Sequence, residues 1–340
     1  MEQFDVIGRS FARLDGPPKA TAQVKYLDDL VFPDMLWGRI LRSEYAHARI
    51  ARIDTSRAER LKGVSAVVTG ADVPLVRSGR HFKDRTMFAT DKVRYAGDAL
   101  AAVAATDLET AERAIRLIDV EYEELPLVLD PIQAMHAGAP LVHEQCSTYP
   151  GYRTGAAREG YSDNVATFTL IEHGDLEKGF AEADYVFEDT YATHRQAHCA
   201  LETHGAVASF DPILGKITIW TTSAAPYRIR SGVCEFLNLP TSKVKIVLSC
   251  VGGSFGGKLE AEVEPFCALL TMKACKPVKI LYMRGEEFRA CYSRHPAVVT
   301  IRTGVKRDGT LTAREVRAVF NAGSRANFGS LVTAYASALA

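Results

Sequence analysis

Four glycines punctuate the stretch Cys250-Val251-Gly252-Gly253-Ser254-Phe255-Gly256-Gly257-Lys258-Leu259. The residues before it, 244–248, alternate like a half-buried strand, and those after it, 261–273, have helical spacing. The glycines therefore lie in a strand-to-helix turn. Because glycine accepts positive φ and a helix N-terminus offers unpaired N–H groups, this arrangement predicts a cradle for a phosphate or an oxyanion.

Two nucleotide-binding patterns can be compared with this glycine loop. Gly252, Gly257 and Lys258 have the G-x-x-x-x-G-K spacing of a P-loop, but Leu259 stands where Ser or Thr would hold magnesium. A Rossmann G-x-G-x-x-G does not fit, and Phe255 would crowd a nest of backbone amides. From the residues alone, a nucleotide-binding protein and a merely structural tight turn both stay open.

The composition is that of an ordinary globular protein. The 340 residues are 47% hydrophobic and 24% charged, and the chain is long enough for two domains with cores. Lys plus Arg and Asp plus Glu number 41 each, so no bulk charge attracts nucleic acid or an acidic membrane. No apolar run approaches the roughly 18 to 20 residues that span a bilayer, and the acidic start lacks the features of a secretory signal. We expect a cytoplasmic protein without nucleic-acid or membrane partners.

Cysteine and histidine patterns argue against a metal held by this chain's own side chains. The seven cysteines are scattered without a C-x-x-C pair, which disfavours a zinc site, an iron–sulfur cluster or a disulfide framework. His194, His198, Glu202 and His204 cluster before the glycine loop, but their surroundings predict strand and turn rather than helix. We therefore expect buried thiols and no histidine-ligated metal.

Local patterns divide the chain into two α/β segments. In the first, we expect strands at 36–40, 66–69, 99–105 and 120–124, and a helix at 108–117 capped by Thr106-Asp107. Asp130-Pro131 interrupts this pattern, and the stretch to 163 has few periodic apolar residues, which is typical of a surface linker.

The second segment repeats the mixture of strands and helices. Its expected strands are 168–173, 185–191, 206–210, 217–221 and 278–283, and its expected helices are 176–181 and 226–237. Residues 298–303 and 311–320, joined across Lys306-Arg307-Asp308-Gly309, predict a hairpin.

Gly-Gly-Ser-Phe-Gly-Gly-Lys at 252–258 resembles the Gly-Gly-Gly-Phe-Gly-Gly-Lys signature of the molybdopterin-binding large subunit of the xanthine oxidase family of molybdenum hydroxylases. Further stretches similar to that family run along essentially the whole chain: Ile7-Gly8-Arg9, Asp15-Gly16, Lys25-Tyr26-Leu27-Asp28-Asp29, Leu41-Arg42-Ser43, Ala46-His47-Ala48-Arg49-Ile50, Val93-Arg94-Tyr95-Ala96-Gly97-Asp98 and Leu201-Glu202-Thr203-His204. The resemblance implies an α/β (α+β) chain. Its parts would be an aldehyde oxidase/xanthine dehydrogenase a/b hammerhead domain at 1–131, a linker at 132–163 and an incomplete first molybdopterin-binding domain at 164–340.

The resemblance also assigns residues that face the cofactor's metal. Gln196 matches the family's glutamine that hydrogen-bonds an oxygen or sulfur ligand of molybdenum, and a neutral amide can donate there without adding charge. The backbone N–H of Phe255 would face the metal's oxo ligand, and Ser254 adds a hydroxyl where the family usually has glycine.

Other residues would contact the pterin and the substrate. Gly253, Gly256 and Gly257 would let the loop wrap the pterin. Glu202 and Leu259 are the expected substrate residues, and Leu259 replaces a glutamate of purine-oxidising relatives, which favours a different or less polar substrate.

The activity implied is oxidation or hydroxylation of an aromatic heterocycle or aldehyde with water, with electrons passing to partner subunits that carry 2Fe-2S and FAD. The expected cofactor is molybdopterin, in the form of molybdopterin cytosine dinucleotide. The family's later blocks, with an arginine–glycine motif and a general-base glutamate, do not appear before Ala340. The chain is therefore expected to be either a fragment or one part of a split large subunit whose second chain supplies these blocks, and we expect no catalytic residue here. Alternatives are an aromatic acyl-CoA reductase of the 4-hydroxybenzoyl-CoA type in the same family, and a non-catalytic scaffold for assembly.

Overall fold

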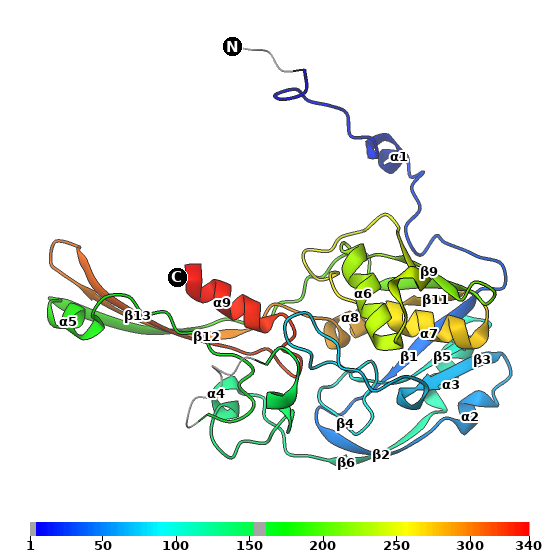
Figure 1. The fold of residues 1–340 in the computed structure, drawn as a ribbon, viewed down its shortest axis with the longest axis horizontal. Coiled ribbons are helices and arrows are strands. Elements are labelled where there is room, and N and C mark those ends of the chain that lie inside the picture. Colours follow the sequence, from blue (N-terminus) through cyan, green and yellow to red (C-terminus); the bar gives the residue numbers. More distant parts are fainter. Residues whose placement is uncertain (1–4, 153–160, 340) are drawn as a thin grey trace.

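A mixed seven-stranded sheet forms the centre of the computed structural model, which describes residues 5–152 and 161–339 (Figure 1). Its strands are, in spatial order, β10 (Val244–Leu248), β9 (Lys216–Thr221), β8 (Gly205–Asp211), β11 (Val278–Leu281), β1 (Leu36–Arg42), β5 (Ala99–Ala105) and β3 (Val64–Thr69). Strands from both segments join in this sheet, because β1 pairs in parallel with β11. The expected boundaries at 131 and 164 stay a prediction, and residues 1–4 and 153–160 lie outside the described part.

The most apolar of the predicted strands, at residues 99–105, is confirmed as β5. All seven of its residues are buried, and it pairs antiparallel with β1 on one side and β3 on the other. A strand covered on both faces needs no polar alternation, which explains the continuous Ala and Val run. The following helix α3 (Leu108–Arg116) is capped as expected, since the Asp107 carboxylate accepts a 2.8 Å hydrogen bond from the Thr110 N–H.

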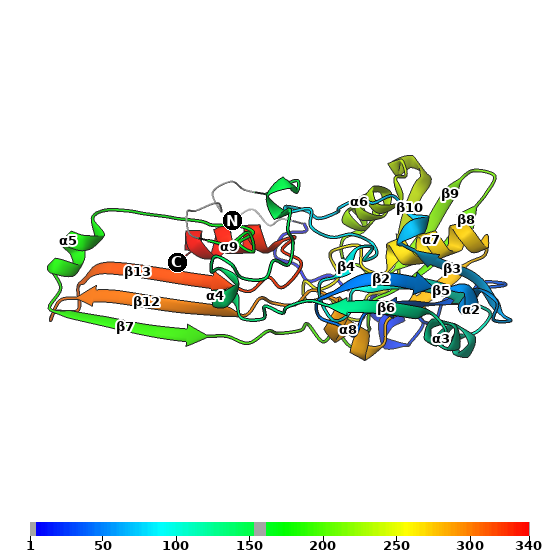
Figure 2. The ribbon, with the colours of Figure 1, turned by 90° about the horizontal axis from the view of Figure 1, so that it is seen from below.

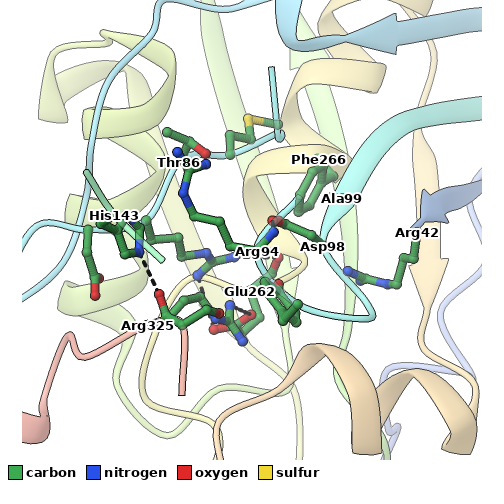
Figure 3. Close-up of a pocket in the computed structure, with 14 residues that line it drawn as sticks. Arg42, Thr86, Arg94, Asp98, Ala99, His143, Glu262, Phe266 and Arg325 are labelled. Carbon is green, nitrogen blue, oxygen red and sulfur yellow. Dashed lines mark hydrogen bonds and ion pairs between the residues drawn. The ribbon is translucent and has the colours of Figure 1, made fainter. Parts of the chain in front are cut away.

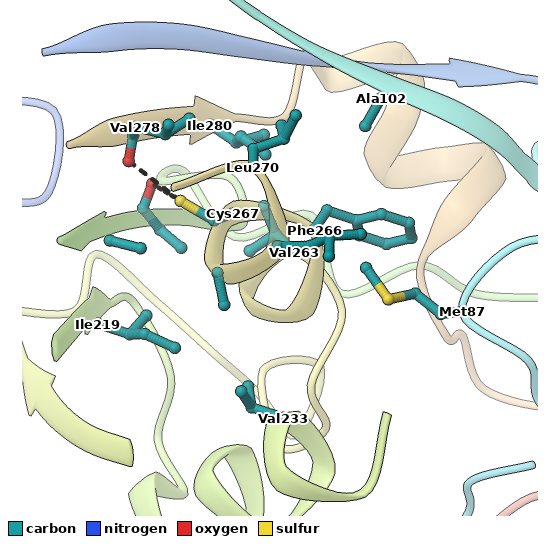
Figure 4. Close-up of a cluster of buried hydrophobic side chains, with 14 of the residues drawn as sticks. Met87, Ala102, Ile219, Val233, Val263, Phe266, Cys267, Leu270, Val278 and Ile280 are labelled. Carbon is teal, nitrogen blue, oxygen red and sulfur yellow. Dashed lines mark hydrogen bonds between the residues drawn. The ribbon is translucent and has the colours of Figure 1, made fainter. Parts of the chain in front are cut away.

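The helix α7 (Glu264–Ala274) joins the cores of the two segments. It packs against β8 and against α6 (Pro226–Leu237), and almost all of its side chains are buried (Figure 4). Its Phe266 meets Phe88 of the first segment edge-on, with ring centroids 5.0 Å apart, and the Cys267 thiol donates to the Val278 carbonyl at 3.1 Å. The main hydrophobic core is therefore continuous across both segments.

Two smaller antiparallel sheets flank the central one. The strands β13 (Leu311–Phe320), β12 (Ala297–Val305) and β7 (Tyr185–Ala192) form a long arm that extends away from the body, with α5 (Leu176–Ala181) at its far end (Figure 2). The predicted hairpin is thereby confirmed. The other sheet consists of β4 (Lys92–Val93), β2 (Ala48–Asp54) and β6 (Asp119–Glu124). Other helices in the described part of the chain are α1 (Gly16–Ala20), α2 (Ser56–Glu59), η1 (Gly70–Asp72), α4 (Pro131–Ala134), η2 (Cys146–Thr148), η4 (Thr241–Lys243), α8 (Arg284–Ala290) and α9 (Gly329–Leu339).

One predicted strand is wrong, and several elements of the structure were not predicted. Residues 168–173 are not a strand, because alternation of residues alone does not make a sheet. The strand β2 was not expected, because a register shift between Ile50 and Arg52 breaks its alternation. The short helix α8 was also missed, since it begins with charged residues and a glycine. Within the described ranges, the chain has no helix with the length and hydropathy needed to cross a bilayer.

Candidate functional site

The glycine loop follows β10 and exposes its middle residues. Gly253, Phe255 and Gly256 have φ values of +109°, +52° and +87°, so the backbone passes through the left-handed region three times within four residues. The Gly257 N–H donates to the Ser254 carbonyl at 2.8 Å, which closes a turn around Phe255. The Phe255 side chain is 74% exposed. A non-glycine residue held in this conformation and turned to solvent is typical of a functional loop.

Residues 196–204 pack closely against two glycines of this loop. A Cβ on Gly253 would lie 3.2 Å from the Ala200 Cβ, and a Cβ on Gly257 would lie 2.8 Å from the His198 Nδ1. Gln196 begins the same segment, exposed, and its backbone exchanges two hydrogen bonds with Arg294. The predicted cofactor-facing residues therefore lie on two adjoining stretches.

Glu202 holds the start of the loop instead of facing solvent. Its Oε2 accepts the Gly252 N–H at 2.6 Å, and the Glu202 N–H donates to the Gly252 carbonyl at 3.2 Å. The Lys258 Nζ lies 3.4 Å from the same Oε2, and Lys258 is only 2% exposed. Burial lowers the pKa of Lys258, and the charge of Glu202 opposes that shift. Lys258 therefore points into the protein, away from any phosphate at the surface.

The expected anion cradle at a helix N-terminus is wrong. Helix α7 begins at Glu264, beyond the loop, and the Glu264 carboxylate itself accepts the N–H groups of Glu262 at 3.0 Å and Val263 at 3.2 Å. Thr221 donates to the other oxygen of the same carboxylate. The two N–H groups just before α7 are thus bound by a buried carboxylate of this chain and not by an outside anion.

A cavity opens beside the loop and brings in residues that the sequence did not single out. Its lining includes Ser254 and Lys258 of the loop, His198, and Glu287 and Cys291 at α8. The Ser254 hydroxyl accepts the Lys258 N–H at 3.3 Å, so the added oxygen serves the turn itself. Leu259, one of the two expected substrate residues, is half-buried.

The cluster of histidines is split by the fold. His194 is exposed and His198 is half-buried, whereas His204 is buried beside Glu287 and Cys291. The His204 Nδ1 lies 2.9 and 3.1 Å from the two Glu287 oxygens and 3.4 Å from the Cys291 sulfur. The sequence alone missed Glu287 and Cys291 as neighbours of His204. Their spacing of four residues could have indicated them, because it places both side chains on one face of a helix.

A second cavity lies where the first segment meets residues 324–327 (Figure 3). Its lining carries several arginines together with buried carboxylates. Arg85 lies 3.0 Å and Arg325 lies 3.6 Å from opposite oxygens of Glu262, while burial raises the pKa of Asp84 to about 6. These contacts fasten the first segment to the second, and the predicted cofactor and substrate residues do not line this cavity.

Two family descriptions match the chain. Residues 21–126 match "Aldehyde oxidase and xanthine dehydrogenase, a/b hammerhead domain", and residues 158–340 match "Molybdopterin cofactor-binding domain". The expected fold class and domain order are therefore confirmed.

Individual relatives agree with these matches. The chain is 40% identical to a probable xanthine dehydrogenase subunit of Bacillus subtilis, over 95% of this chain and 41% of that protein. It is 34% identical to the "Nicotinate dehydrogenase large molybdopterin subunit" of Eubacterium barkeri, over 97% of this chain and 74% of that subunit. The crystal structure of a Cu,Mo-CO dehydrogenase superposes with a TM-score of 0.81 at 34% identity, over 92% of this chain and 40% of that one. The chain thus spans less than half the length of two of these three relatives.

Proposed function

The chain belongs to the xanthine oxidase family of molybdopterin-binding large subunits, whose N-terminal portion it matches, and from this premise we propose that it forms one wall of the cofactor site of a molybdenum hydroxylase. The substrate would be an aromatic heterocycle or an aldehyde. The observation that carries the proposal is the glycine loop, which packs against residues 196–204 through its glycines and exposes the left-handed Phe255.

The open face of the loop suits a molybdopterin. A Cβ on Gly256 would meet nothing nearer than the His198 Nε2 at 3.9 Å, so the backbone at this point is free on its outer side. The two close approaches at Gly253 and Gly257 lie on the inner side, where they fix the loop against the protein. A rigid backbone with an uncovered outer face can be approached by a large cofactor without rearrangement.

Gln196 and Phe255 would hold the metal end of the cofactor. The Gln196 amide and the Phe255 backbone N–H would each donate to an acceptor atom of the bound group, and Gly253, Ser254, Gly256 and Gly257 would line the pterin. When bound, molybdopterin supplies the two-electron oxidation of the substrate carbon. Leu259 in place of a glutamate favours a substrate less polar than a purine. Glu202 would contribute to the substrate side of the site indirectly, by fixing Gly252 at the start of the loop.

Partner chains are part of the proposal. Subunits with 2Fe-2S and FAD would accept the electrons. The part of the large subunit that these residues do not match would complete the site and carry the general base, on the same polypeptide or on a partner chain. Two of the relatives are themselves named as subunits, one of a xanthine dehydrogenase and one of a nicotinate dehydrogenase, which supports an assembly of this kind. Molybdopterin cytosine dinucleotide as the cofactor form and a cytoplasmic location stay predictions. An aromatic acyl-CoA reductase and a non-catalytic scaffold are the competing functions.

Cofactor analysis of the chain purified with its co-purifying partners tests the proposal. We expect molybdenum and pterin together with iron and flavin, and Gln196→Ala should lower turnover of heterocycles or aldehydes while the melting temperature stays unchanged. Gln145→Ala, at another exposed glutamine, is the matched control. An intact complex without molybdenum and pterin would support the scaffold, and turnover only of aromatic CoA thioesters would support the reductase.

A further inference from the structure

We infer that His204 is a positioning residue, which ties the end of the glycine loop to helix α8 and, with Glu202, holds the loop at both ends. The His204 Nε2 lies 3.2 Å from the Gly257 carbonyl oxygen, and its Nδ1 lies 2.9 Å from the nearer Glu287 oxygen. The residue is 5% exposed, so water does not compete for these bonds. The inference concerns how the proposed cofactor loop is held and rests on the proposed function only for that loop's role.

The nearest neighbour of each ring nitrogen is a hydrogen-bond acceptor, a Glu287 oxygen for Nδ1 and the Gly257 carbonyl for Nε2, and the Cys291 sulfur lies farther from Nδ1, at 3.4 Å. A backbone carbonyl and a carboxylate offer no proton, so each ring nitrogen must donate. A neutral histidine has one N–H and can satisfy only one of them, whereas an imidazolium satisfies both. The geometry therefore selects the doubly protonated ring, and the charge strengthens the bond to Gly257 as well as the bond to Glu287.

The surrounding charges agree with this assignment. Burial opposes the charge on His204, but Cys291 and the Glu287 carboxylate outweigh it, and the pKa of His204 is raised well above its ordinary value. Burial likewise opposes ionisation of Glu287, yet the contacts with His204 leave its pKa lowered. Lys258, on the loop, also lowers the pKa of Glu287, and further titratable groups near His204 are His198, Glu264 and Tyr282.

Glu202 and His204 form a two-point clamp on the loop. Glu202 accepts the Gly252 N–H at 2.6 Å, and His204, two residues later, donates to the Gly257 carbonyl. The stretch 252–257, which these two points delimit, contains all three left-handed conformations of the loop. Phe255 is the non-glycine residue among the three, and its strained conformation persists only where the surrounding structure holds it, for which the clamp supplies two fixed points.

The clamp can be tested by hydrogen exchange of the loop amides, measured by mass spectrometry on the chain with its co-purifying partners. His204→Leu removes both donors, and we expect the peptide that covers 252–258 to exchange about tenfold faster or more, the effect of losing one charge-assisted hydrogen bond. His204→Gln retains one donor and should give an intermediate rate. His143→Leu is the matched control, because His143 is also buried and bonded to a backbone carbonyl, that of Ser324 at 2.8 Å.

The outcomes separate this inference from the proposed function. Faster exchange confined to the loop in His204→Leu, and absent in His143→Leu, supports the clamp whether or not pterin is present. If loop exchange is unchanged and the melting temperature falls equally in both variants, His204 contributes only to the packing of the core, and the inference is overturned. A stoichiometric zinc or copper ion that is lost in Glu287→Gln would also overturn it, because the Nδ1 would then bind a metal instead of carrying a proton.

Discussion

The carboxylate of Glu202 accepts a 2.6 Å hydrogen bond from the backbone N–H of Gly252, across a separation of 50 residues, and the same oxygen lies 3.4 Å from the buried ammonium of Lys258. One side chain thus fixes the entry of the glycine loop and compensates the charge at its exit. Both loop ends depend on a residue that the sequence alone suggested as a substrate contact.

Glu202→Ala should therefore destabilise the protein by about 2 to 3 kcal/mol, because it leaves a buried lysine and a half-buried amide without their acceptor. Urea unfolding followed by circular dichroism measures the change. Glu188→Ala, whose carboxylate is 61% exposed and pairs with Arg302 at 3.7 Å, should change stability by less than about 0.5 kcal/mol. Equal effects of the two substitutions would contradict the role given to Glu202.

Gly257→Ala should cost about 1 to 3 kcal/mol, because its Cβ would lie 2.8 Å from the His198 ring. Removing that ring should relieve the overlap. The double variant Gly257→Ala/His198→Ala should therefore lose less free energy of unfolding than the sum of the losses in the two single variants. Gly285→Ala is the control, since the nearest atom to its Cβ would be the flexible end of Arg289 at 3.9 Å. Additive single changes would show that the close approach is not what requires glycine.

Asp84 should make stability fall as the pH rises from about 4 to about 6. Burial raises its pKa from 3.8 to about 6, although the Ala326 N–H opposes the shift, so the folded protein binds the proton more tightly than the unfolded chain. This stabilisation is complete below pH 3.8, is lost as the pH passes 6, and amounts to about 3 kcal/mol. Asp84→Asn, compared with wild type by urea unfolding across this range, should remove that part of the slope. An identical slope in the variant would refute the shift.

Addition of magnesium and ATP should leave the melting temperature unchanged. Lys258 faces Glu202 inside the protein, and α7 begins at Glu264, beyond the loop, so neither the lysine nor the helix end has the position that a P-loop needs. Thermal unfolding with and without millimolar nucleotide is the measurement. A saturable rise in melting temperature would restore the nucleotide-binding alternative.

The sequence by itself determined the elements whose pattern is local. The run of small apolar residues that forms β5, the Asp107 cap of α3, and the hairpin across residues 306–309 were each predicted and found. The glycine loop was located for the same reason, since four glycines that follow an alternating strand indicate a tight turn with positive φ. These features depend on φ, on side-chain periodicity and on neighbours within a few positions.

Only the tertiary structure decided which distant elements meet. The parallel pairing of β1 with β11 joins two segments into one sheet, and no local pattern of Leu36 or Val278 specifies that partner. Glu287 became part of the loop's support because α8 folds back beside His204, and Lys258 became a buried partner of Glu202 instead of a phosphate ligand. Such contacts follow from long-range packing, where burial selects the charge pairs and hydrogen bonds that can be satisfied together.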